Sequence, residues 1–74
     1  MEDIRRTRRR GRYKGHDYVV TLYTRTDGRM TTVEDIEIEG FPSISRSDGR
    51  LQGDTPDLAF AAAERWIAEW LDKR

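Results

Sequence analysis

The first fifteen residues of this chain differ from the rest in charge and in their capacity to form a core. Residues 1–15 hold seven of the fourteen basic residues against two acidic ones, a net charge of +5. Residues 16–74 hold seven basic and twelve acidic residues, a net charge of −5, so the whole chain is neutral. The basic segment contains almost no core-forming residue apart from Ile4 and Tyr13. Because like-charge runs are usually disordered and often serve as interaction tails, the sequence predicts a flexible basic arm over residues 1–15 and a single small α+β domain over residues 16–74.

The length and composition limit what the domain can be. A chain of 74 residues buries roughly 60% of the surface that it exposes when unfolded, so its stability is marginal, and a homodimer would bury more. It has no cysteine, so neither a disulfide nor a thiolate zinc site can form. The basic N-terminus is not followed by an apolar stretch, and the longest apolar run, residues 58–63, is far shorter than a membrane span. We expect a soluble cytoplasmic protein without membrane contact.

Two segments predict a β-hairpin. Residues 16–26, HDYVVTLYTRT, are rich in β-branched and aromatic residues, as strands are. The Asp27-Gly28 pair that follows is a strong signal for a two-residue hairpin turn. A second strand is expected from Arg29 to about Glu39, and residues 41–46, FPSISR, predict a short third strand at an edge of the sheet because of Pro42. A second turn is expected at residues 47–49.

The register of this hairpin predicts one extra residue in the second strand. With a two-residue turn, Leu22 lies opposite Val33, but the core residue Val20 would lie opposite Asp35. An extra residue at Glu34 or Asp35 corrects this mismatch and forms a β-bulge. The bulge keeps six residues on one face of the sheet: Tyr18, Val20, Leu22, Val33, Ile36 and Ile38.

The C-terminal segment predicts an α-helix. Thr55 suits the N-cap, Pro56 suits the first helical position and Asp57 complements the positive end of the helix dipole. An apolar stripe with helical spacing follows, and it should pack on the sheet. Its residues are Leu58, Ala59, Phe60, Ala63, Trp66, Ile67, Trp70 and Leu71. The predicted architecture is therefore a three-stranded antiparallel sheet with one helix across one face, preceded by the basic arm.

The basic arm is a candidate nucleic-acid-binding site, because cations placed on phosphates release counterions and give salt-dependent binding. The alternatives are a solubilising tail or a segment that folds back on the acidic body. The candidate residues are Arg5, Arg6, Arg8, Arg9, Arg10, Arg12 and Lys14.

A second candidate is an acidic patch in the second strand, which could dock a basic partner. The alternative is an edge strand protected by charge against aggregation. The patch also argues against entry of the sheet into a DNA groove, where carboxylates would face phosphates. Its residues are Glu34, Asp35, Glu37 and Glu39.

We identify no catalytic, metal or cofactor site. His16 is the only histidine and has no nucleophile at a suggestive spacing, so we interpret it as structural or solvent-facing. Two pairs of glycines, Gly11 with Gly15 and Gly49 with Gly53, are not followed by the lysine and serine of a phosphate-binding loop. Asp48, Asp54 and Asp57 do not match the spacing of a calcium loop.

Residues 41–71, FPSISRSDGRLQGDTPDLAFAAAERWIAEWL, resemble part of the HicB-like antitoxin domains. The resemblance rests on a Phe-Pro strand and on a Gly-Asp-Thr that leads into an Ala-rich helix, with matching positions at Gly53, Asp54, Thr55, Ala59 and Ala63. It implies a small sheet with packed helices that binds and silences a toxin ribonuclease. The layout also looks like that of phage integrase arm-binding domains, which carry basic N-terminal tails.

Together these features predict a non-enzymatic binding module without a cofactor, which regulates or inhibits a protein or nucleoprotein partner and is consistent with a phage or mobile-element origin. The alternative is a nucleic-acid-binding module that acts through its arginine-rich segment.

Overall fold

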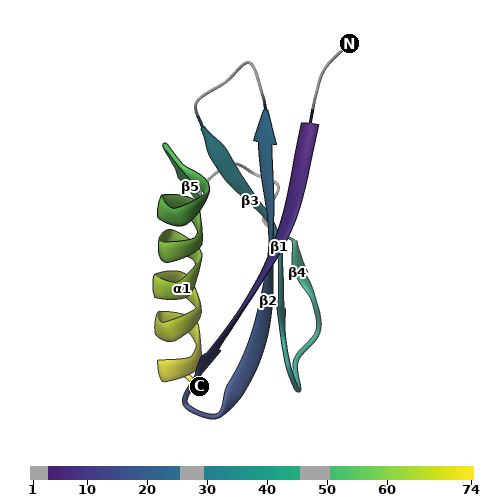
Figure 1. The fold of residues 1–74 in the computed structure, drawn as a ribbon. Coiled ribbons are helices and arrows are strands. Elements are labelled where there is room, and N and C mark those ends of the chain that lie inside the picture. Colours follow the sequence, from purple (N-terminus) through teal and green to yellow (C-terminus); the bar gives the residue numbers. More distant parts are fainter. Residues whose placement is uncertain (1–3, 26–29, 46–50) are drawn as a thin grey trace.

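The computed structural model describes residues 4–25, 30–45 and 51–74. In these residues, five strands form one antiparallel sheet and a single helix packs across one of its faces (Figure 1). The sheet order is β1-β2-β3-β4, and β5 pairs with the start of β3. The α+β class is as predicted, but the expected number of three strands is too low. The element bounds are β1 Ile4–Tyr13, β2 His16–Arg25, β3 Thr31–Ile38, β4 Ile44–Ser45, β5 Gln52–Gly53 and α1 Pro56–Asp72.

Strand β1 corrects the prediction of a flexible arm over residues 1–15. Residues Ile4–Tyr13 pair with β2 along ten positions, from Tyr13 opposite His16 to Ile4 opposite Arg25. The turn between them consists of Lys14 and Gly15, with φ of 48° and 82°. Positive φ at both central residues is the geometry of the hairpin turn that matches strand twist. The charge run is therefore stabilised as a strand by pairing with β2, and not by an apolar face of its own.

Gly11 shows how β1 fits the rest of the domain. It lies opposite Tyr18, whose ring covers it so closely that an added Cβ would lie 2.5 Å from ring atoms. The Tyr18 hydroxyl then donates a hydrogen bond to Glu64 Oε2 on α1, at 2.5 Å. Burial and this hydrogen bond raise the pKa of Tyr18. One tyrosine thus connects β1, β2 and the helix.

The register of β2 and β3 confirms the predicted bulge. Leu22 pairs with Val33 and Thr21 pairs with Asp35, so the register shifts between Thr21 and Leu22 and leaves Glu34 as the extra residue. Beyond the shift, Val20 pairs with Ile36 and Tyr18 with Ile38. The bulge lets all the apolar residues of β3 face the helix.

Two deletions should test the bulge. Removing Glu34 leaves Val33, Ile36 and Ile38 on one face of a regularly alternating strand, so we expect that variant to fold with a small loss of stability. Removing Glu37 instead brings Ile36 and Ile38 next to each other, on opposite faces, and should abolish cooperative unfolding. Thermal melts followed by circular dichroism compare the two; equal loss in both variants would contradict this account of β3.

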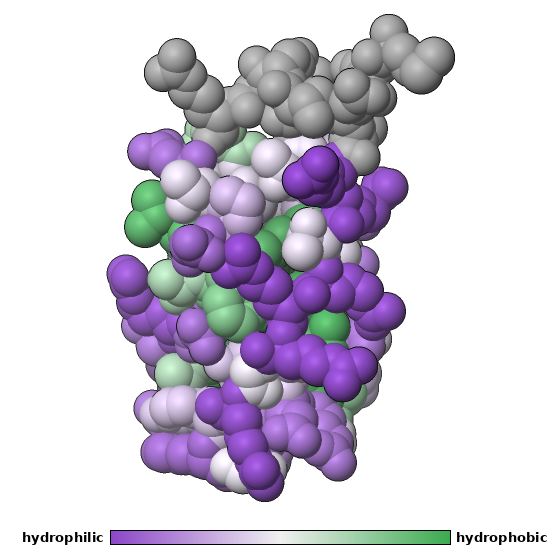
Figure 2. All heavy atoms as spheres, in the orientation of Figure 1, coloured by the Kyte–Doolittle hydropathy of each residue, from purple (hydrophilic) through white to green (hydrophobic). Residues whose placement is uncertain are grey.

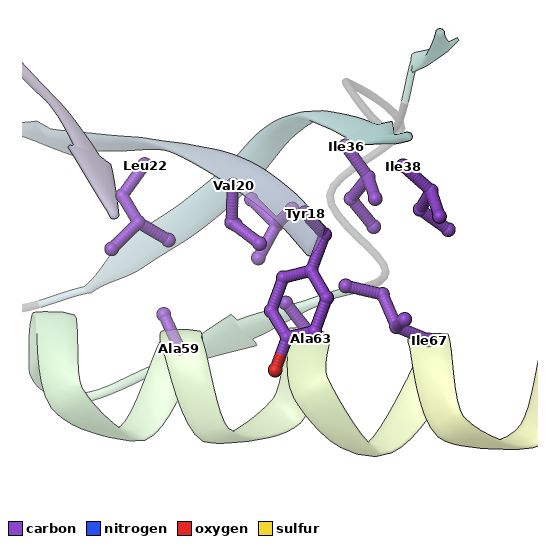
Figure 3. Packing of buried hydrophobic residues seen from close by; sticks show 9 residues of the cluster. Tyr18, Val20, Leu22, Ile36, Ile38, Ala59, Ala63 and Ile67 are labelled. Atoms are coloured by element: carbon purple, nitrogen blue, oxygen red, sulfur yellow. The ribbon is translucent and has the colours of Figure 1, made fainter. Parts of the chain in front are cut away.

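The core lies between the sheet and α1 (Figure 3). All six predicted sheet residues are buried, together with three residues of the helix: Ala59, Ala63 and Ile67. Helix α1 begins as predicted, with Thr55 as N-cap accepting a hydrogen bond from the Leu58 N–H. The predicted apolar stripe is wrong for Leu58, which is 54% exposed.

The two tryptophans pack around this core and not at its centre. Both are partly buried, and their rings stack on each other with centroids 6.1 Å apart. The Trp70 and Phe41 rings pack in a T-shaped arrangement with their centroids 4.9 Å apart. The centroids of the Phe41 and His16 rings are 5.6 Å apart. His16 therefore has a packing contact, in agreement with its structural interpretation.

The short strands β4 and β5 both pair with β3: β5 pairs with Thr31 and Thr32 at its start, and β4 pairs with Asp35 and Ile36 farther along the strand. β4 covers only two residues of the predicted third strand, and β5 was not predicted. The predicted turns at residues 27–28 and 47–49 lie outside the described residues.

Candidate binding surface

In the described part of the chain, one face of the sheet carries no helix, and the arginines at even positions of β1 lie on that face. Thr7, Arg9 and Gly11 pair with buried core residues of β2, so they share the helix side. Because side chains alternate along a strand, the even-numbered positions are on the other side, which we call the open face. They are Arg6, Arg8, Arg10 and Arg12.

The predicted acidic patch lies on the same open face. Asp35 pairs with Thr21 and Glu37 with Val19, and both partners alternate with the buried residues of β2. Glu34 is the bulge residue beside them, and Glu39 follows the end of β3. The two sets of residues that the sequence singled out therefore meet on one surface, with β2 between them.

Ion pairs across the open face join the two sets. Arg6 Nε lies 3.1 Å from Glu34 Oε2, and Arg8 Nη2 lies 3.6 Å from Glu37 Oε1. Neighbouring strands are about 4.8 Å apart, and a long arginine side chain spans the strand between. Arg6 also lies over the Tyr23 ring, 5.6 Å from its centroid. Such exposed pairs each contribute about 0–1 kcal/mol, so a partner can displace them at little cost.

The remaining three of the seven candidate basic residues do not lie on the open face. Arg9 Nη1 lies 2.5 Å from Asp57 Oδ1 and over the Phe60 ring on α1. Lys14 Nζ lies 2.6 Å from Asp72 Oδ1 at the end of the helix. Arg5 shares the helix side by register, opposite Thr24. The seven candidate residues are thus divided between two sides of the sheet.

Arg10 differs from its neighbours on the open face. Arg6, Arg8 and Arg12 each have a carboxylate within 4.0 Å, the last being Asp17 at 3.4 Å. Arg10 is exposed and has no such partner among residues 4–25, 30–45 and 51–74. It borders an open hollow of about 700 Å³ on this side of the sheet, which Glu37, Glu39 and Phe41 also line. Figure 2 shows hydrophilic side chains gathered along the path of β1.

The hairpin turn is fastened to the helix end by Asp72. Its carboxylate accepts hydrogen bonds from Lys14 Nζ and, at 3.2 Å, from the Tyr13 hydroxyl. The Lys14 bond, aided by Tyr13 and by the charge of Lys14, holds the pKa of Asp72 below its usual range. The same hydrogen bond and the charge of Asp72 raise the pKa of Lys14.

These shifts predict a pH dependence. A carboxylate with a lowered folded pKa contributes stability above its unfolded pKa, ~3.9, and loses it as the pH falls through the folded value. A lysine with a raised pKa contributes stability below its unfolded pKa, ~10.4, and loses it as the pH rises through the folded value. Asp72→Asn should therefore flatten the fall of the melting temperature below about pH 4. Parallel melting-temperature profiles for the variant and the wild type would refute this.

In the part of the chain that the structure describes, no three His, Cys, Asp or Glu side chains are grouped so that they could hold a metal ion. The same part contains no helix long and apolar enough to cross a membrane.

Comparison with protein-family models, curated proteins and solved structures finds no match to this chain. The resemblance of residues 41–71 to HicB-like domains stays a prediction.

The sequence did not predict that residues 4–13 form a strand, β1, which contributes the arginine row of the open face. The available signals were weak: a Lys14-Gly15 pair at a turn, and a glycine placed to accommodate Tyr18. Neither outweighs a run of arginines when the sequence is read alone.

Proposed function

We propose that this chain is a small non-enzymatic binding module that regulates or inhibits a protein partner, which it engages through the open face. The observation that carries the proposal is the juxtaposition of an arginine row on β1 with a carboxylate row on β3. Complementary charges at an interface fix register and select partners more than they add affinity. A surface with ordered rows of both signs suits that task.

A protein partner fits this surface better than a nucleic acid does. Phosphates that approached Arg6 and Arg8 would also approach Glu34 and Glu37, which are already paired with those arginines. Arg9 and Lys14 are held on the helix side by Asp57 and Asp72. The segment therefore presents fewer free cations on one face than its composition suggests, whereas a protein can offer groups of both signs.

The proposal can be tested by site-specific photocrosslinking in the native cell. A crosslinker at Thr21, between the two charged rows, should capture a discrete protein, and one at Arg65, an exposed residue of α1, should not. Glu37→Lys should reduce this capture because it reverses the charge at one position of the carboxylate row on β3.

Titration with DNA and RNA at two salt concentrations tests the alternative, that the open face binds nucleic acid. A nucleic-acid surface would bind with a steep salt dependence, and Glu37→Lys would strengthen that binding. This result, with no protein captured at Thr21, would overturn the proposed function.

A further inference from the structure

Strand β1 is an edge of the sheet along its whole length. It pairs with β2 on one side, and the sheet order places no strand of the described chain on its other side. A two-residue turn closes on a hydrogen-bonded pair, here Tyr13 and His16. Hydrogen-bonded and non-hydrogen-bonded pairs then alternate, so the odd-numbered residues of β1 bond to β2. The N–H and C=O groups of the even-numbered residues therefore point away from the sheet.

The same even-numbered residues carry the arginines of the open face. Arg6, Arg8 and Arg12 have side chains that are 60%, 64% and 71% exposed despite their ion pairs, and Arg10 is exposed without one. Arginines two positions apart on a strand are about 6.8 Å apart. The free edge thus combines main-chain donors and acceptors with a regular row of cations.

This charge row selects against one obvious occupant, a second copy of β1. In an antiparallel pair of two β1 strands, arginines would lie opposite arginines on the same face, and like charges directly opposite are destabilising. An acidic strand has the complementary pattern. Residues opposite Arg8 and Arg10 on the same face would be about 5.5 Å away between Cα atoms, which suits arginine–carboxylate pairs.

We infer that the free edge of β1 accepts an extended segment of the protein partner that carries carboxylates at alternate positions, and that this segment extends the sheet by one strand. This inference rests on the proposed function and names the chemistry of its partner. Main-chain hydrogen bonds supply affinity in strand addition, and alternate side chains supply specificity. We expect Arg10 to form the main ion pair with this segment, since Arg10 has no ion pair within the described chain that binding would have to break.

The test uses the full chain and a synthetic peptide of ten residues, the length of β1, in which glutamate alternates with threonine and valine. A control peptide of the same composition has its glutamates clustered at one end. The alternating peptide should bind about tenfold more tightly than the clustered one, a difference of about 1.4 kcal/mol. On binding, the amides of Arg8, Arg10 and Arg12 should become protected from hydrogen exchange.

Matched variants separate the main-chain and charge contributions. Arg10→Pro removes one N–H from the free edge, a position where strands tolerate proline, and should abolish peptide binding. Arg8→Gln with Arg10→Gln keeps the main chain and should weaken binding about tenfold, whereas Arg65→Gln on α1 should leave it unchanged. If Arg10→Pro fails to fold, the glutamine variants and intermolecular NOEs between the peptide and β1 decide the question.

Two results would overturn the inference: equal binding of both peptides, or binding without new protection at the even positions of β1. Its failure is distinguishable from failure of the proposed function. Protein capture at Thr21 without peptide binding would reject the edge site alone, and peptide binding without protein capture would reject the proposed function.

Discussion

A chain shortened to residues 15–74 should lose its cooperative thermal transition. Without β1, the main-chain groups of β2 that pair with it have no partner, and the Tyr18 ring loses the surface of Gly11 on which it lies. Each net hydrogen bond is worth about 1 kcal/mol, and a domain of this size has roughly 4–11 kcal/mol in total. Loss of a ten-residue strand therefore exceeds what the fold can sustain. Circular dichroism melts and the dispersion of amide resonances measure the effect.

The matched control removes the charge and keeps the strand. Replacing Arg6, Arg8, Arg10 and Arg12 by threonine introduces a residue type that favours strands, and it removes exposed ion pairs and the contact of Arg6 with the Tyr23 ring. This variant should melt cooperatively. If the shortened chain melted like the wild type, residues 4–13 would not be part of the folded domain.

Leu22→Ala should destabilise the domain by about 3–5 kcal/mol, the cost of a cavity left by a fully buried leucine. Leu22 is 0% exposed, and it packs on the helix-facing side of β2. Given the small total stability, this variant should be largely unfolded at 37 °C.

Leu58→Ala supplies the comparison, because it deletes the same atoms from a residue that is 54% exposed. It should change the free energy of unfolding by less than about 0.5 kcal/mol. Chemical denaturation of both variants gives the two values. Similar losses would mean that α1 is rotated about its axis relative to the structure.

The parts of the fold that follow from burial could be predicted from the sequence. The alternation of β2 and the mismatch at Asp35 together located the bulge, because a buried carboxylate costs more than an irregular ladder. Thr55 and Pro56 located the start of α1 because capping is a local property. Leu58 was placed wrongly because an apolar stripe at the first turn of a helix can extend past the edge of the core.

The candidate surface could be predicted only in part. The two sets of charged residues were identified, but their contact across β2 depends on β1 being a strand. Arginine has no strong preference for strands, and its apolar neighbours in β1 are few. The energy that orders β1 comes from pairing with β2 and from contacts such as Gly11 with Tyr18. These contacts depend on the partner strand β2, and the residue pattern of β1 alone does not reveal them.

Amide hydrogen exchange across residues 5–12 of the full chain tests the central claim most directly. The N–H groups of Thr7, Arg9 and Gly11 bond to β2 in the register described, so they should be protected to near the global stability of the domain. The N–H groups of Arg6, Arg8, Arg10 and Arg12 lie on the free edge and should exchange quickly. An alternation of slow and fast amides is the result that this account predicts. Fast exchange at every position from Arg5 to Arg12 would contradict it and restore a flexible basic arm.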